Sequence, residues 1–145
     1  GCLKHKKKTG DCALRKLYLL FSHRLTDEQR KQALEQLKVK EIKYLPEPLQ
    51  KAWSNVPPDV PYINDYLAPI KEWLDSEADP GDYVLVQGDF GAAYIMVNWA
   101  FSKGFVPVYS TTERTAEEKM GPDGEVQLSR RFSHVRYRLY ERNFR

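Results

Sequence analysis

The stretch Tyr83-Val84-Leu85-Val86-Gln87-Gly88-Asp89-Phe90-Gly91 decides the fold of this 145-residue chain. Four consecutive apolar residues are typical of a strand that is buried on both faces, as in a parallel sheet. Residues 92–103 are rich in Ala, Met, Val and Trp and predict a helix, which Gly104 ends. The stretch therefore predicts a strand, a turn and a helix in succession, which is the repeating unit of an α/β fold.

Comparable segments precede this unit and follow it. Residues 17–21 are a second apolar run of strand length, and Thr26 with Gln29 predicts a capping box for a helix that reaches about Leu37. Four further elements are predicted: a strand, a short helix, an amphipathic helix and a last parallel strand at 39–45, 49–53, 62–74 and 105–109. Pro107 has no amide hydrogen and places the last strand near the sheet edge, with polar residues 110–112 closing it.

The C-terminal part predicts antiparallel structure. Gly121-Pro122-Asp123-Gly124 is a turn signal between two polar strands. Val135, Tyr137 and Leu139 alternate with polar residues and indicate a half-buried strand. The predicted fold class is α/β, a Rossmann-like, mainly parallel sheet with helices on both faces and a C-terminal β-hairpin.

Composition bounds the class of protein. The 41% hydrophobic and 30% charged fractions suit one globular domain over residues 16–145, and the net charge is +3. Residues 1–15 hold five basic residues against one acid and are interpreted as a flexible basic leader, native or added for expression. No segment suits a bilayer span or a secretory signal, so we expect a cytoplasmic protein without a membrane partner. Cys2 and Cys12 lack zinc-ligand spacing, and we expect no metal and no cofactor.

Polar residues follow three of the predicted parallel strands. Ser22 and His23 follow the first strand, the turn from Gln87 follows the third, and residues 110–114 follow the fourth. Open α/β sheets bind ligands outside the carboxyl ends of their strands. We therefore expect these clusters to meet at one rim.

The turn at Gln87-Gly88-Asp89-Phe90-Gly91 is the most informative cluster. Gly88 and Gly91 allow the backbone to approach a ligand or to take positive φ, and the next helix presents unpaired amides to an anion. Phe90 offers a ring on which a base can stack. The alternative is an ordinary turn in which Asp89 caps the helix and Phe90 lies in the core. The motif is neither a dinucleotide fingerprint nor a Walker loop.

The remaining candidates can exchange a proton or contact a phosphate. His23 can transfer a proton near neutral pH, or it can simply cap the next helix. Hydroxyl and cationic side chains can bind phosphate oxygens, although exposed surface positions or local turns are the alternative. These candidates are Ser22, Thr111, Thr112, Arg114, His134 and Arg136.

An ordered set of segments resembles a family of small stand-alone CRISPR-associated proteins from type III loci, related to CARF (CRISPR-associated Rossmann fold) domains. The set covers most of residues 16–140. Its segments are Leu19-Leu20-Phe21-Ser22-His23-Arg24-Leu25-Thr26, Tyr44-Leu45-Pro46, Trp53-Ser54-Asn55-Val56-Pro57-Pro58, Gly81 through Ala92, and Tyr109-Ser110-Thr111-Thr112-Glu113-Arg114.

The resemblance implies a homodimer that binds cyclic oligoadenylate, usually cyclic tetra-adenylate, and linearises it as a ring nuclease that ends type III CRISPR signalling in antiviral defence. Cleavage would be metal-independent: a ribose 2′-OH attacks the adjacent phosphorus and leaves a 2′,3′-cyclic phosphate. In this interpretation His23 and Arg114 are catalytic, and the turn from Gln87 to Gly91 holds phosphate.

Two alternatives stay open beside the ring nuclease. The first is a module that sequesters the same messenger without cutting it, because one rim can serve either purpose. The second is binding of long RNA or DNA by the arginine-rich residues 126–145, which carry six arginines against Glu141. The eight acidic residues in 59–89 and the small net charge argue against that second alternative, so we expect no long nucleic acid as a partner.

Overall fold

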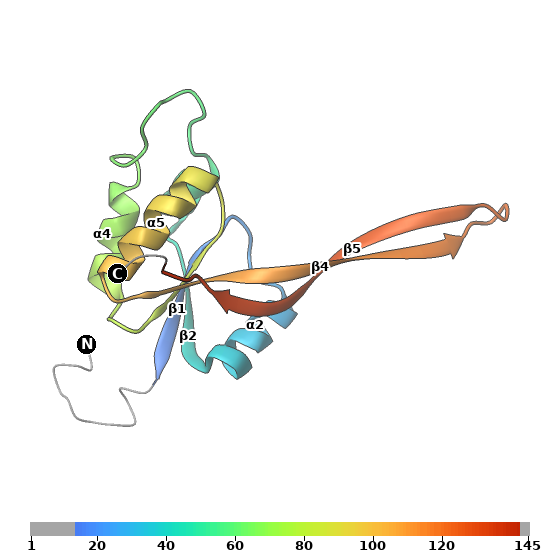
Figure 1. The fold of residues 1–145 in the computed structure, drawn as a ribbon, viewed down its shortest axis with the longest axis horizontal. Helices are drawn as coiled ribbons and strands as arrows, with labels where there is room; N and C mark the ends of the chain where they lie inside the picture. The colour runs from blue at the N-terminus through green and yellow to red at the C-terminus, as the bar shows by residue number, and fades with distance from the viewer. Residues whose placement is uncertain (1–13, 143–145) are drawn as a thin grey trace.

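The computed structural model describes residues 14–142, with the backbone alone at residues 117 and 129–131. Within this range the order of elements follows the expected alternation of strands and helices (Figure 1). The elements are β1 (Arg15–Leu20), α2 (Asp27–Gln32), the π-helical turn η2 (Ala33–Leu37), β2 (Val39–Tyr44), α3 (Glu47–Ser54), α4 (Ala68–Glu77), β3 (Tyr83–Val86), α5 (Phe90–Ser102), β4 (Val106–Met120) and β5 (Val126–Leu139).

The five strands form one sheet in the order β2-β1-β3-β4-β5. The first four strands are mutually parallel, and β5 pairs antiparallel with β4. β2 lies on one side of β1, and β3, the next strand in the chain, lies on the other side of β1. This reversal is a topological switch point, and its place between β1 and β3 matters for the site.

Helices cover both faces of the sheet, as the apolar runs predict. Tyr18, Leu20 and Val84 pack with α3, α4 and α5 on one face. Leu17 and Leu19 point to the other face and pack with Ala33 and Leu37 of η2. Successive residues of β1 thus enter different cores, and this explains why the strand is apolar without alternation. The predicted mainly parallel α/β architecture is confirmed.

Two predicted boundaries are wrong. The strand expected at 105–109 does not close at Ser110 but runs to Met120, and it lies near the edge of the sheet, as expected, with β5 as the edge strand. Pro107 is accommodated because β5 ends at Leu139, opposite Val108, and leaves the proline amide position outside the antiparallel ladder. The helix expected at 62–74 is α4, which begins only at Ala68, where Pro69 suits a first helical turn.

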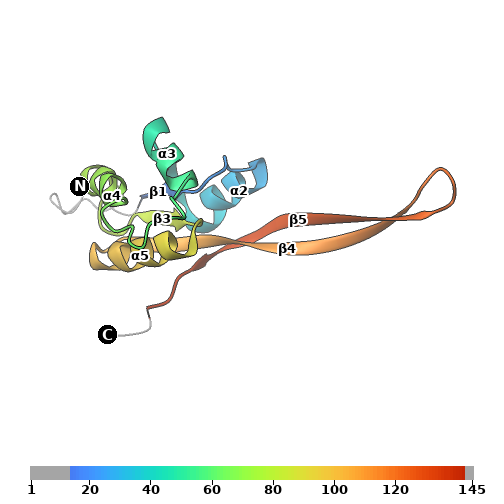
Figure 2. The same ribbon diagram turned by 90° about the horizontal axis from the view of Figure 1, so that it is seen from above.

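The predicted hairpin is confirmed, but it is far longer than the sequence indicates. β4 and β5 leave the body of the sheet together and continue as a two-stranded arm (Figures 1 and 2). The pairing register shifts between Thr111 and Thr112, a β-bulge at the base of the arm. This shift leaves Val135 unpaired and exposed, while Tyr137 is buried. Leu139, at the end of β5, is also exposed, so the simple alternation predicted for these residues is wrong.

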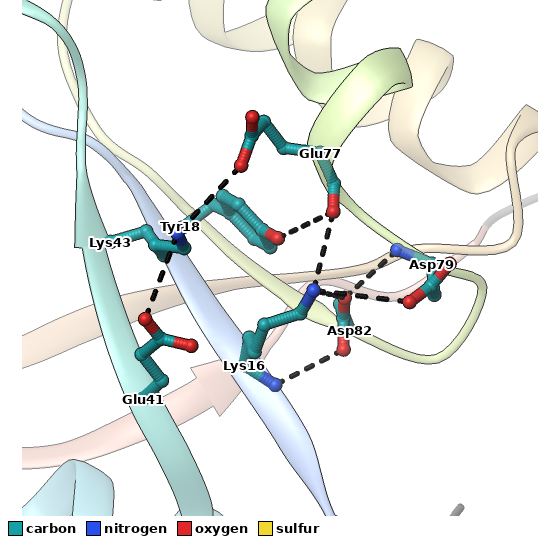
Figure 3. A network of polar contacts seen from close by, with 7 residues as sticks. All are labelled: Lys16, Tyr18, Glu41, Lys43, Glu77, Asp79 and Asp82. Atoms are coloured by element: carbon teal, nitrogen blue, oxygen red, sulfur yellow. Dashed lines mark hydrogen bonds and ion pairs between the residues drawn. The ribbon is translucent and has the colours of Figure 1, made fainter. Parts of the chain in front are cut away.

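A polar network closes the amino-terminal edge of the sheet, away from the candidate site (Figure 3). The carboxylate of Asp82, which is 3% exposed, accepts hydrogen bonds from the main-chain N–H groups of Lys16 and Asp79 at 3.1 and 2.9 Å. The Lys16 ammonium lies 3.8 Å from Asp82, and the Tyr18 hydroxyl donates to the carbonyl of Glu77 at 2.8 Å. These contacts fix the start of β1 to the turn that precedes β3.

Candidate site at the carboxyl edge of the sheet

The candidate site begins at the switch point, where β1 and β3 end side by side. The main-chain N–H of Gln87 donates to the carbonyl of Leu20 at 3.1 Å and continues the pairing beyond the last residues of both strands. The chain then diverges, with Ser22 and His23 on one side and the turn from Gly88 on the other. Two of the three clusters expected at the rim are therefore present at the same edge.

The turn is held in place by buried Trp53. Its indole N–H donates to the carbonyl of Gln87 at 2.9 Å, and the side chain is 1% exposed. A Cβ on Gly88 would lie 2.8 Å from the indole nitrogen, which is too close for any side chain. Gly88 is thus required by the approach of Trp53, whereas a Cβ on Gly91 would make only ordinary contacts. Neither glycine has positive φ, so that part of the expectation is wrong.

The start of α5 combines a capped helix end with an exposed ring. The Asp89 carboxylate accepts from the N–H of Ala92 at 3.0 Å, so it acts as the N-cap. Phe90 is 94% exposed, which excludes the alternative that it lies in the core. Tyr94, one turn later on the same helix, is 73% exposed. Two aromatic faces are therefore open to a ligand beside the turn.

His23 lies in a hollow of about 270 Å³. Its ring meets that of Phe21 edge-on, with centroids 5.6 Å apart. Arg24 holds its guanidinium over the Tyr44 ring, 4.4 Å from the centroid, so a cation lies in the same hollow as the imidazole. The hollow is lined by Ser22, His23, Arg24, Tyr44, Leu45, Glu47 and Gln50.

The base of the arm is tied to the turn by buried hydrogen bonds. The side-chain oxygen of Gln87 accepts from the main-chain N–H of Ser110 at 2.7 Å. The Ser110 hydroxyl shares a hydrogen bond of 2.6 Å with His134 Nδ1 and accepts from the Gln29 amide at 3.3 Å. The Tyr137 hydroxyl donates to the carbonyl of Gln29 at 2.8 Å. The turn, α2 and the arm are thus connected.

His134 is nine-tenths buried in this network. Burial lowers the pKa of His134 below its ordinary value, and Glu28 partly opposes the shift. The other ring nitrogen, Nε2, is buried and has no hydrogen-bond partner. The residue therefore acts as a neutral bridge in the base of the arm, and it is not a cation exposed at the rim.

The predicted site residues do not share one hollow in the described part of the chain. Asp89 and Gly91 line a hollow of about 440 Å³, and Phe90 lines another of about 490 Å³ along α5. Thr112 and His134 line a third of about 400 Å³ beside the start of α2. The three other predicted residues on β4 and β5 form local contacts: the Arg114 guanidinium lies over the Phe132 ring on the arm, and the Thr111 hydroxyl bonds the main chain of Arg136.

The sequence did not predict two residues of the site, Arg24 and Trp53. Arg24 adjoins the Ser22-His23 pair in the sequence, and this adjacency was the available signal for its place in the same hollow. Trp53 lies far from the turn in the sequence, and nothing local indicates its contact with Gln87. Among the described residues, no group of three or more His, Cys, Asp or Glu side chains can hold a metal ion. In the same part of the chain, no helix has the length and apolarity to cross a membrane.

The fold and this edge define a small α/β protein with a hollow beside its β1/β3 switch point. The chain belongs to the uncharacterized protein MJ1673 family, whose model matches residues 15–138. The uncharacterized protein MJ1673 of Methanocaldococcus jannaschii is 54% identical over 125 residues, which cover 86% of this chain and 96% of that protein. No solved structure matches the chain.

Proposed function

We propose that this protein is a CARF-like ring nuclease that binds cyclic oligoadenylate at the carboxyl edge of its sheet and linearises it without a metal. The observation that carries the proposal is the convergence at the β1/β3 switch point. There an imidazole, a hydroxyl and a fixed guanidinium lie on one side, and the turn with its exposed aromatic rings lies on the other. Switch points are where open α/β sheets bind nucleotides.

Each part of the ligand has a counterpart at this edge. Phosphates suit the Arg24 guanidinium and the Ser22 hydroxyl, because both donate hydrogen bonds to anionic oxygens. Adenine rings suit the open faces of Phe90 and Tyr94, which stand 94% and 73% exposed. A ring of alternating phosphates and bases therefore has both kinds of partner within one rim.

The proposed reaction needs no water. A ribose 2′-oxygen attacks the adjacent phosphorus, the bond from phosphorus to the 5′-oxygen breaks, and the 2′-proton ends on the leaving oxygen. His23 takes up the 2′-proton or returns one to the 5′-oxygen, and Arg24 stabilises the charge on the phosphorane oxygens. The products are a 2′,3′-cyclic phosphate and a 5′-hydroxyl.

The geometry changes the set of proposed catalytic residues. Arg24 lies in the hollow of His23, whereas Arg114 lies on the arm over Phe132. His134 is buried and bonded to Ser110. We therefore assign charge stabilisation to Arg24, and we give His134 and Gln87 the role of holding the turn.

The test is incubation of the full chain with labelled cyclic tetra-adenylate in the presence of a chelator. We expect a linear product that carries a 2′,3′-cyclic phosphate. His23→Ala should abolish turnover while ligand binding persists, and Arg24→Ala should weaken both. Lys31→Ala, an exposed position on α2, is the matched control and should behave as the wild type.

The outcomes separate cleavage from sequestration. Tight binding of the ring with no product at excess protein would replace the nuclease by a binding module that sequesters the messenger. Absence of binding would refute both functions. Equal loss of binding and turnover in His23→Ala would make that residue a ligand contact and remove its role in proton transfer.

A further inference from the structure

The arm, defined as residues 112–134, has two chemically different faces. On one face the cross-strand partners are Met120 with Val126, Glu118 with Leu128, and Arg114 with Phe132. Its four large apolar side chains are 56–78% exposed. We name this the apolar arm face; its described side chains are Thr112, Arg114, Ala116, Glu118, Met120, Val126, Leu128, Phe132 and His134.

The opposite face of the arm is polar. Its described cross-strand partners include Glu113 with Ser133 and Lys119 with Gln127. Such alternation is typical of strands with one face against a core. Yet the arm extends away from the body of the molecule (Figures 1 and 2), and the exposed fractions show that the apolar arm face is uncovered. A two-stranded hairpin without a cover is marginally stable in water.

Charge is divided along the arm. The outer part, residues 117–125, carries four acidic residues against Lys119. The inner part, residues 112–116 and 126–134, carries three arginines against Glu113. The basic end is at the body and the acidic end is at the tip. An arm with this polarity complements a second arm that runs in the opposite direction.

We propose that two copies of this chain dimerise by packing their apolar arm faces against each other, antiparallel, so that each tip lies over the base of the other arm. This two-fold arrangement brings Glu118 of each copy toward the arginine-rich base of its partner. It also covers Phe132 with the apolar tip residues Met120 and Val126. A parallel arrangement would instead place tip on tip and oppose like charges.

The size of the arm indicates how far the contact must extend. Nine residues of β4 beyond the bulge span roughly 30 Å, and two strands are about 10 Å wide, so one face offers only a few hundred Å². Stable interfaces bury about 800 Å² per partner. The tip must therefore also contact the partner's body. A hollow of about 400 Å³ adjoins the base of the arm; it is lined by Phe132, His134 and the start of α2, which includes Asp27 and Glu28.

The same charge pattern disfavours a nucleic acid as the occupant. Residues 113–133 hold five acidic residues against four basic ones. A segment that binds phosphates needs a clear positive excess. A second copy needs only complementary ends and a shared apolar face, and this arm has both.

The experiment measures the mass of the full chain by light scattering over a concentration series, without nucleotide. We expect two 16.9 kDa chains per particle. Leu128→Asp should raise the dissociation constant roughly tenfold or more, because a charge replaces a buried apolar contact. Gln127→Asp is the matched control, since it adds the same charge at the next residue but on the polar face, and it should change the constant much less.

Charge reversal tests the antiparallel direction. Glu118→Arg and Arg114→Glu should each weaken the dimer, and the double variant should recover much of the wild-type affinity. A monomer at every concentration, or equal effects of Leu128→Asp and Gln127→Asp, would overturn the proposal. The inference does not rest on the messenger: loss of ring cleavage with an intact dimer, or the reverse result, tells the two proposals apart.

Discussion

The substitution Gly88→Ala tests how the turn at the switch point is built. A Cβ at this position would lie 2.8 Å from the indole nitrogen of Trp53 and 3.0 and 3.1 Å from two ring carbons. Trp53 is 1% exposed and cannot swing into solvent without opening the core. We therefore expect the indole to shift and its hydrogen bond to the carbonyl of Gln87 to break.

The magnitude follows from two terms. Forcing an extra methyl group against a packed ring costs about 1–3 kcal/mol, and leaving a buried N–H without its acceptor costs about 1–3 kcal/mol. The same movement of the Trp53 ring relieves part of the steric clash and breaks the hydrogen bond to Gln87. The two costs are therefore not fully additive. We expect a loss of about 2–4 kcal/mol in the free energy of unfolding. That loss corresponds to a fall in Tm of about 5–15 °C.

The assay is urea unfolding of Gly88→Ala, with Gly91→Ala in the same turn as the matched control. Gly91→Ala places its Cβ 3.4 Å from Asp89 and 3.8 Å from Ile63, and it removes a glycine from the first turn of α5. We expect it to be neutral or to stabilise by up to about 1 kcal/mol. In a Trp53→Phe background, which lacks the indole nitrogen, Gly88→Ala should cost much less than in the wild type. Equal stability of the two alanine variants would refute the steric argument.

Three further predictions concern buried polar groups. Asp82→Asn should lower the free energy of unfolding by about 1–3 kcal/mol, because one of the two carboxylate oxygens becomes an N–H₂ group that faces a main-chain N–H donor; urea unfolding measures it. The pKa of His134 is lowered in the folded state, so its neutral form stabilises the fold above about pH 6.5, and this contribution is lost as the pH falls below that value. The unfolding midpoint of His134→Gln should therefore fall less between about pH 7.5 and 5.5 than that of the wild type; an equal or steeper fall would contradict this assignment. Tyr137→Phe should lose about 1 kcal/mol, since its hydroxyl donates to a carbonyl in α2, and thermal unfolding should register the change.

The fold could be predicted wherever one local rule decided a segment. The apolar runs at 17–21 and 83–86 indicate strands because burial on both faces leaves no room for polar side chains. Thr26 and Gln29 form both hydrogen bonds of the predicted capping box, at 3.1 and 2.9 Å. These signals need no knowledge of distant residues.

The length of the arm could not be predicted, and the reason is physical. Its strands pack against no core in the described chain, so residues 110–120 alternate without the hydrophobicity that marks a buried strand. The turn at 121–124 was visible, but the β-bulge after Thr111 changes the facing of every later residue on β5. Val135 is exposed for this reason, although the local pattern favours burial. Leu139 is exposed at the last position of β5.

The sequence predicted the sheet edge at which the candidate site lies, but it did not predict which side chains make contact there. Which strand ends meet depends on strand order, and parallel topology alone indicates their common edge. The contacts that fix the edge join Trp53 with Gln87 and Ser110 with His134, and such pairs leave no signal in a single sequence. The same limit explains why Arg114 was expected beside His23.

The arm also makes the hydrodynamic size of the protein larger than its mass alone would give. A compact chain of this length has a radius of gyration of about 15 Å, whereas the arm alone extends roughly 30 Å beyond the bulge. A single copy therefore diffuses as slowly as a larger compact protein and would leave a gel-filtration column early. Two copies with arms packed antiparallel share that length, so the dimer gains a second body at the far end of the arm and is also elongated. The elution volume is consequently a poor measure of how many chains a particle contains, and scattering mass is the quantity that counts them.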